Sequence, residues 1–239
     1  MRYASRSLGA VALGILGAAL VSARADVLTW TAANTGDWFV VDNWTNTTTP
    51  ESTRVPADGD DAVIASAGAT VLLNSSSAAL GSLLVSNATL CFSNWDTLLS
   101  ATTLTVEKSG VLTCIGPFTN SAMSNRVNLA CDTLLVAAGG AINVNDKGYA
   151  GGLAVGGDTW SAGHGPGGYA GAGGSYGGGG LLASAFINPY YMTNLYGSAT
   201  APIDPGSGGG IYGSVVGKLG GHGGGAVCIT AVQVVVNGS

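Results

Sequence analysis

Charged side chains are scarce in this chain of 239 residues, since only 9% of them are Asp, Glu, Lys or Arg, against about a quarter in an average soluble protein. Only eight residues are basic, and the formal net charge is −5. Such a chain has no electrostatic means of holding a phosphate backbone, so we expect no nucleic acid as a partner. Hydrophobic residues nevertheless reach 46% of the chain, which is enough to build a packed core.

Long hydrophobic runs are absent except at the amino terminus. There, two arginines precede an uncharged stretch from Leu8 to Val21, and Ala23-Arg24-Ala25 has the small-x-small pattern of a signal-peptidase site. The stretch is shorter than the roughly 20 residues that span a hydrocarbon core. We therefore expect residues 1–25 to be a cleaved signal peptide and the rest of the chain to contain no membrane span.

Cysteine is also rare, with four in the whole chain. An exported protein reaches a compartment where disulfides form, and four cysteines allow three pairings between which the sequence does not choose. A stacked pair of Cys91 and Cys114 fits if their repeats are adjacent, and four buried free thiols are the alternative. No Cys-x-x-Cys and no nearby pair of histidines occur, so we expect no zinc. Apart from calcium at a cluster of aspartates, we expect no metal, and we expect no cofactor. The four cysteines are Cys91, Cys114, Cys131 and Cys228.

What the chain does have is a short phrase that recurs: an apolar strand end, a tight turn and a second apolar strand. The strand ends lie at Ile64, Val85, Val106 and Val136, separated by 21, 21 and 30 residues. Such spacing is typical of a β-solenoid, in which each coil stacks on the previous one, and the Leu-x-Val alternation sends one face inward. The sequence therefore predicts an all-β fold, a right-handed parallel β-solenoid (β-helix), in which these residues form a ladder.

Glycine has two expected roles. In the turns of three repeats Gly68, Gly110 and Gly140 permit a positive φ, and Asn87 occupies the fourth turn. Gly139–Gly225 holds thirty of the forty glycines, which predicts either a long excursion folded back on the solenoid or a flexible Gly/Tyr linker.

These patterns divide the chain into five segments. They are the signal peptide (1–25), a Trp-rich amino-terminal cap with the first coil (26–74), solenoid coils (75–145), the glycine-rich excursion (146–225) and a final strand pair (226–239). Because the chain stops directly after a strand, we expect a truncated product with further coils missing.

Three tryptophans stand in the order Trp30, Gly-x-Trp38 and Asn-Trp44, followed by Pro-x-x-x-Asp-x-Ala-x-Ile64. This order resembles the amino-terminal module of large exported bacterial surface proteins of the autotransporter-like, parallel β-helix type, and the glycine-rich phrases resemble the same proteins. The resemblance implies that the module caps the solenoid and that the excursion leaves one coil and returns to the next. Bulky indoles would cover the open end; a sugar-stacking platform is the alternative.

Carboxylates cluster most densely at Asp58, Asp60 and Asp61. They predict a calcium site, an acid/base pair for glycoside hydrolysis or an ordinary turn. Elsewhere the repeats offer only a scattered charged set, consisting of Glu107, Lys108, Arg126 and Asp132.

Together these features predict a secreted or cell-surface bacterial protein with a structural or adhesive role and no catalytic activity of its own. Its expected partners are extracellular polysaccharide or other surface proteins. The alternative is a polysaccharide-active lyase or glycoside hydrolase on the same scaffold, because a fold does not determine function. A groove with clustered Asp and Arg or Lys would favour the enzyme, and a plain Thr/Ser/Asn face would favour the structural role.

Overall fold

The computed structural model describes residues 25–119, 122–155, 160–176, 195–198, 200–212 and 216–239. Its regular elements are strands, apart from the short 3-10 helix Val41–Asn43, so the predicted all-β fold is confirmed. Within these residues no helix is long and apolar enough to cross a membrane. The predicted signal peptide lies outside them, apart from Ala25.

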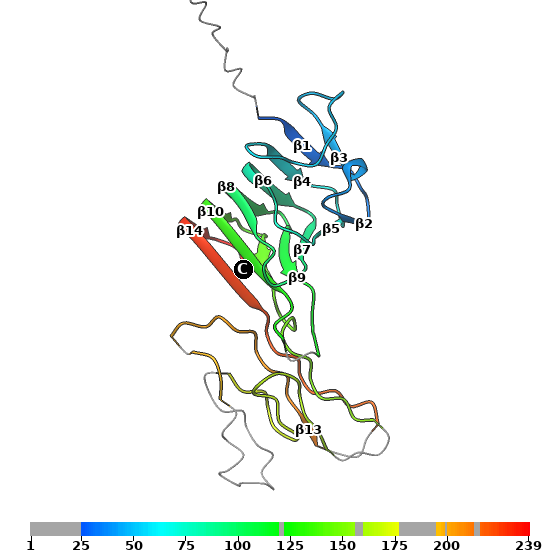
Figure 1. The fold of residues 1–239 in the computed structure, drawn as a ribbon, viewed down its shortest axis with the longest axis vertical. Coiled ribbons are helices and arrows are strands. Elements are labelled where there is room, and N and C mark those ends of the chain that lie inside the picture. Colours follow the sequence, from blue (N-terminus) through cyan, green and yellow to red (C-terminus); the bar gives the residue numbers. More distant parts are fainter. Residues whose placement is uncertain (1–24, 120–121, 156–159, 177–194, 199, 213–215) are drawn as a thin grey trace, which may run out of the picture.

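The strands form two main sheets, and within each sheet the strands follow one another along the molecule (Figure 1). The larger sheet contains, in spatial order, β14 (Ala226–Val236), β10 (Arg126–Val136), β8 (Leu99–Glu107), β6 (Ala79–Ser86), β4 (Asp61–Ile64), β1 (Val27–Trp30) and β3 (Trp44–Asn46). The smaller sheet contains β11 (Ala141–Ile142), β9 (Val111–Cys114), β7 (Thr89–Phe92), β5 (Thr70–Leu73) and β2 (Thr35–Asp37). Neighbouring strands in both sheets are parallel, except for the antiparallel pair of β1 and β3.

The predicted ladder of strand ends is present. Ile64 lies opposite Val85, Val85 opposite Val106, and Val106 opposite Val136. All four side chains are buried, with at most 1% exposed. Val236 of β14 adds a further step opposite Val136, although the whole glycine-rich segment separates the two in sequence. The spacing of the repeats therefore identifies true neighbours, and the chain returns to the stack after the excursion.

Each repeat contributes one strand to each main sheet, as in β6 followed by β7 and β8 followed by β9. Inward leucines stack from strand to strand, with Leu104 between Leu83 and Leu134. They belong to one core cluster that joins the inward residues of both sheets. Full burial of a leucine side chain contributes about 1.5–3 kcal/mol, so each repeat is stabilised chiefly by the repeats on either side of it.

The turns between the two sheets use glycine in two ways. Positive φ angles fall on Gly68 (75°), Asn87 (53°), Ser109 (63°) and Gly139 (84°). Gly110 and Gly140 follow the last two of these and do not have a positive φ, so the predicted role of these glycines is wrong. They are needed for close approach instead, because a Cβ on Gly110 would lie 2.3 Å from the Val85 carbonyl oxygen, and one on Gly140 would lie 2.2 Å from that of Val106.

Residues 226–239 contain one long strand in place of the predicted strand pair. β14 is 11 residues long and pairs with β10 from Arg126 opposite Ala226 to Val136 opposite Val236. Both halves of the expected strand pair therefore belong to β14 and pair with β10, and the register is interrupted once, at Val232. β14 is the last strand of its sheet, and its aliphatic side chains are correspondingly exposed, Val232 to 87%.

The glycine-rich excursion forms a lobe beyond the ends of the strands (Figure 1, yellow to orange). Its backbone segments lie side by side, as in the hydrogen bonds from Gly148 N to Gly223 O (2.8 Å) and from Gly152 N to Gly209 O (2.9 Å). A Cβ on Gly208 would lie only 1.9 Å from a backbone oxygen, so side chains are excluded by close packing. The described parts of the excursion are therefore joined by backbone hydrogen bonds, which favours the folded-back excursion over the flexible linker; residues 156–159, 177–194, 199 and 213–215 lie outside the description.

All four cysteines are free. β7 and β9 are adjacent, but their register places Cys114 opposite Phe92 and Cys91 opposite Thr113. Because successive residues of a strand point to opposite faces, the two thiols point away from each other and the stacked disulfide is wrong. Burial, with a smaller contribution from Cys91, raises the pKa of the Cys114 thiol to about 11, so this thiol stays protonated and unreactive at neutral pH.

Candidate functional site

The three tryptophans pack together at the end of the larger sheet formed by β1 and β3. Trp30, Trp38 and Trp44 are at most 1% exposed, and the Trp44 ring meets the other two edge to face, at centroid distances of 5.2 and 4.8 Å. The Trp44 indole N–H donates a hydrogen bond to the Trp38 carbonyl oxygen (2.7 Å). Buried indoles present no face to a sugar, and their position at the end of the sheet fits a cap, so the geometry favours the cap over the stacking platform.

The three clustered aspartates point to different partners. Asp58 accepts a hydrogen bond from the Ala79 backbone N–H (2.8 Å), and Asp61 accepts one from the Ser82 hydroxyl (2.6 Å). Asp60 is 3% exposed and accepts its hydrogen bonds from Arg54, Ala57 and Asp26. Throughout the part of the chain that the structure describes, no group of three or more His, Cys, Asp or Glu residues could hold a metal ion. The arrangement does not support the calcium site, and each carboxylate instead ties the turn to its surroundings.

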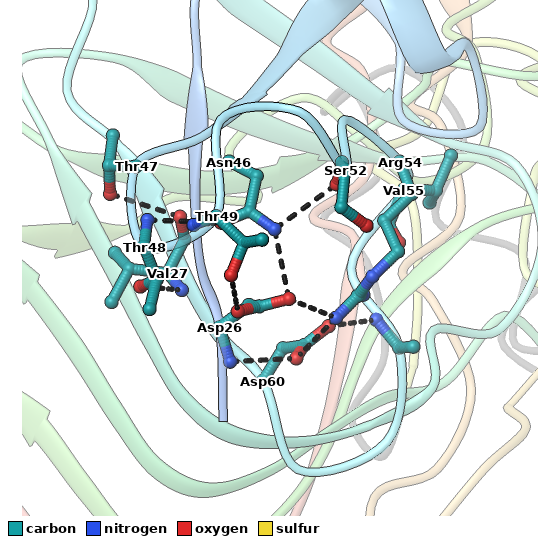
Figure 2. A network of polar contacts seen from close by, with 11 residues as sticks. Asp26, Val27, Asn46, Thr47, Thr48, Thr49, Ser52, Arg54, Val55 and Asp60 are labelled. Carbon is teal, nitrogen blue, oxygen red and sulfur yellow. Dashed lines mark hydrogen bonds and ion pairs between the residues drawn. The ribbon is translucent and has the colours of Figure 1, made fainter. Parts of the chain in front are cut away.

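Asp60 belongs to a polar network at the start of β1 (Figure 2). The Arg54 guanidinium binds both carboxylate oxygens of Asp60, and its Nη2 also lies 2.9 Å from Asp26 Oδ2. Two further donors reach Asp60, the backbone N–H of Ala57 (2.7 Å) and that of Asp26 (3.1 Å). One guanidinium therefore joins two carboxylates from distant parts of the sequence.

Asn46 at the end of β3 completes this network and is fully buried. Its side-chain amide donates to Asp26 Oδ2 (2.9 Å) and to the Ser52 carbonyl oxygen (3.1 Å). Its amide oxygen accepts from the backbone N–H groups of Thr48 (3.0 Å) and Thr49 (2.8 Å). Asn46 thereby fixes the loop that carries Arg54 against the first strand.

The network keeps both carboxylates ionised. Burial raises the pKa of Asp60, but the hydrogen bonds from Arg54, Ala57 and Asp26 outweigh it, and the net pKa is lowered. The hydrogen bond from Asn46 is the main cause that lowers the pKa of Asp26, with help from Thr49 and Arg54 against a cost of burial. The hydrogen bond to Asp60 raises the pKa of Arg54. The one guanidinium is thus shared by two ionised carboxylates, and the hydrogen bonds of the network hold the loop that carries Arg54 against the first strand.

A second feature, an open groove of about 550 Å³, crosses β6, β8, β10 and β14. Small and hydroxyl-bearing side chains dominate its lining, which consists of Gly59, Ala79, Leu80, Gly81, Ser100, Ala101, Thr102, Ala130, Cys131, Asp132, Thr230, Ala231 and Val232. Ser100 lies opposite both Ala79 and Ala130, and Thr230 lies beyond Ala130. This column therefore carries two hydroxyl groups, from Ser100 and Thr230, which lie two strands apart, and Thr102 adds a third to the lining.

Charge is sparse in this groove. Asp132 is the one carboxylate in its lining. Glu107 and Lys108 pair with each other outside it (3.4 Å), and the Arg126 guanidinium stacks over the Trp95 ring at 4.7 Å. The structure thus does not bring the scattered charged set together. Glycoside hydrolysis ordinarily needs two carboxyl groups about 5–10 Å apart, and the groove supplies one.

The comparison with known families bears on the central repeats. Residues 43–129 match the model of the G8 domain. This G8 segment begins just before β3 and ends within β10, so it contains three complete repeats, β4 to β9. It covers less than half of the chain and leaves out Trp30, Trp38, the glycine-rich lobe and β14. No curated protein and no solved structure matches the chain.

Proposed function

We propose that this chain is an exported, secreted or cell-surface protein of a bacterium with a structural and adhesive role. In this proposal the two main sheets belong to one right-handed parallel β-solenoid, and the groove holds a neutral extracellular polysaccharide without cleaving it. The predicted signal peptide and the resemblance of the Trp-rich and glycine-rich segments to autotransporter-like surface proteins support export.

Support for the solenoid comes from the strand pairing. Parallel neighbours in register, with one strand of each repeat in each sheet, are what successive coils produce. Crossover connections between parallel strands of one sheet are right-handed in about 98% of cases, which favours the right-handed form.

The observation that carries the adhesive role is the lining of the groove. Hydroxyl groups of Ser100, Thr102 and Thr230 alternate with alanines, and hydroxyls of this kind donate and accept hydrogen bonds to the hydroxyl groups of a sugar chain. A net charge of −5 disfavours acidic polysaccharides. With a single carboxylate, the groove is better suited to holding a neutral glycan than to cleaving one.

The test is to titrate the purified chain with neutral and acidic polysaccharides, measuring binding by calorimetry and chain cleavage by the release of reducing ends. Wild type should bind at least one neutral glycan and release no ends. Thr102→Arg, which fills the groove, should weaken binding about tenfold, or about 1.4 kcal/mol. Thr105→Arg on the same strand lies outside the groove and serves as the matched control.

Two outcomes would contradict the proposal. If no polysaccharide binds, the adhesive role is wrong. If wild type shortens a polysaccharide and Asp132→Asn does not, the groove is catalytic and the lyase or hydrolase alternative holds.

A further inference from the structure

The polar network contains one donor whose chemistry changes when the signal peptide is removed. The Asp26 backbone nitrogen lies 3.1 Å from Asp60 Oδ1 (Figure 2). Asp26 directly follows Ala25, the last residue of the small-x-small pattern. Cleavage after Ala25 therefore converts this nitrogen from a neutral amide into the amino terminus of the mature chain.

We propose that cleavage between Ala25 and Asp26 creates an α-ammonium group that forms an ion pair with Asp60 and completes the network of Asp26, Arg54 and Asp60. The inference rests on the export proposed above. In the cleavage, a signal peptidase adds one water across the peptide bond, so that Ala25 leaves as a carboxylate and the Asp26 nitrogen becomes an ammonium. No other bond changes, and no oxidant or reductant is required.

The charges of the network favour this product. Before cleavage it holds two carboxylates and one guanidinium, which leaves one negative charge uncompensated. The ammonium brings the sum to zero. It also replaces a neutral donor by a charged one on Asp60, a carboxylate only 3% exposed, and charge-assisted hydrogen bonds are about twice as strong as neutral ones.

The position of the amine matters as much as its charge. Ala25 is exposed, whereas Asp26 and Val27 are half-buried and Leu28 is fully buried. A chain that keeps Ala25 can therefore still fold, but its ammonium group lies one residue further out and Asp26 contributes only an amide. The structure thus distinguishes one cleavage position from its neighbours.

The comparison that tests this uses two chains of equal net charge. One is the processed product of the full chain, secreted by a bacterial host, with its first residue identified by mass spectrometry; the other retains Ala25 as its first residue. We expect Asp26 to be the first residue of the secreted product. We also expect its melting temperature at pH 7 to exceed that of the Ala25 chain by about 2–4 °C.

A pH series gives a second measurement. The acidic groups on the elements around the start of β1 favour a charged amine, whereas Arg54 and partial burial oppose it. The acidic groups are Asp26, Glu51, Asp58, Asp60 and Asp61. The pKa of the amine should exceed its ordinary value of about 7.7–8.0. Its contribution is then fully present below that ordinary value and is lost as the pH rises through the higher pKa of the folded chain.

Asp60→Asn in both chains should abolish the difference in melting temperature. If that variant does not fold, the amine pKa, read from the ¹⁵N shift of Asp26 in the wild-type product, decides instead. Equal melting temperatures of the two chains, or an amine pKa at or below 8, would overturn the ion pair. A secreted product that starts at another residue would overturn the cleavage position. Neither result bears on polysaccharide binding. The ion pair can therefore be disproved while the proposed adhesive role stands, and the reverse also holds.

Discussion

Replacing Arg54 by Met should lower the free energy of unfolding by about 2–3 kcal/mol, measured by denaturant titration at pH 7. Breaking a buried ion pair costs about 3–5 kcal/mol, while exposed pairs contribute under about 1 kcal/mol. Arg54 lies between these limits, because its side chain is 34% exposed whereas the side chain of Asp60 is 4% exposed. Without the guanidinium, Asp26 and Asp60 face each other with no compensating side-chain charge.

The stability that Arg54→Met loses should depend on pH. In wild type the lowered pKa values of Asp26 and Asp60 contribute stability above their ordinary pKa of about 3.9, and this contribution is lost as the pH falls through the lower values of the folded state. The gap between wild type and Arg54→Met should therefore narrow below pH 4. Lys108→Met removes an exposed ion pair and should change stability by under about 1 kcal/mol. Equal losses in both variants would contradict a special role for the network.

Replacing Trp44 by Ala should lower the free energy of unfolding by about 3–5 kcal/mol, the usual cost of deleting a large buried aromatic side chain. Trp44 is 1% exposed and contacts both Trp30 and Trp38. Its loss opens a cavity at the end of the sheet and leaves the Trp38 carbonyl oxygen without its indole donor. Thermal or denaturant unfolding measures the effect.

Phe39→Ala is the matched control, because Phe39 is an aromatic residue beside Trp38 that is 40% exposed. It should cost under about 1 kcal/mol. The Trp44→Ala chain, kept under conditions where it is folded, should still bind polysaccharide as wild type does. Unchanged stability together with lost glycan retention would show that the indoles bind sugar and do not act as a cap.

The stacking of the repeats could be predicted because the same short pattern recurs at a nearly fixed spacing in the sequence. A residue such as Val85 repeats the pattern of Ile64 at a fixed spacing, and parallel strands in register translate that spacing directly into neighbours. Val236 could not be placed by the same method, since the glycine-rich segment interrupts the spacing before β14. The roles of Gly110 and Gly140 could not be predicted either, because the close approach to a carbonyl oxygen involves the neighbouring repeat.

The polar network could not be predicted for a different reason. Asp26, Asn46 and the loop from Arg54 to Asp60 are distant in the sequence, and the pairing of β1 with both β3 and β4 brings them together. One signal was available: Arg54 is one of few basic residues in the chain and lies six positions before Asp60, within the densest group of carboxylates. The sequence shows the aspartates as a cluster, but their partners depend on tertiary contacts.

The most direct test of the stacked arrangement is an NMR experiment on the chain with labelled valine methyl groups. The pairing predicts nuclear Overhauser contacts from Val85 to Val106, from Val106 to Val136 and from Val136 to Val236. The last contact spans the whole glycine-rich segment and requires the chain to return to the same column. Contacts that join these valines to other partners, with none between Val136 and Val236, would contradict the account.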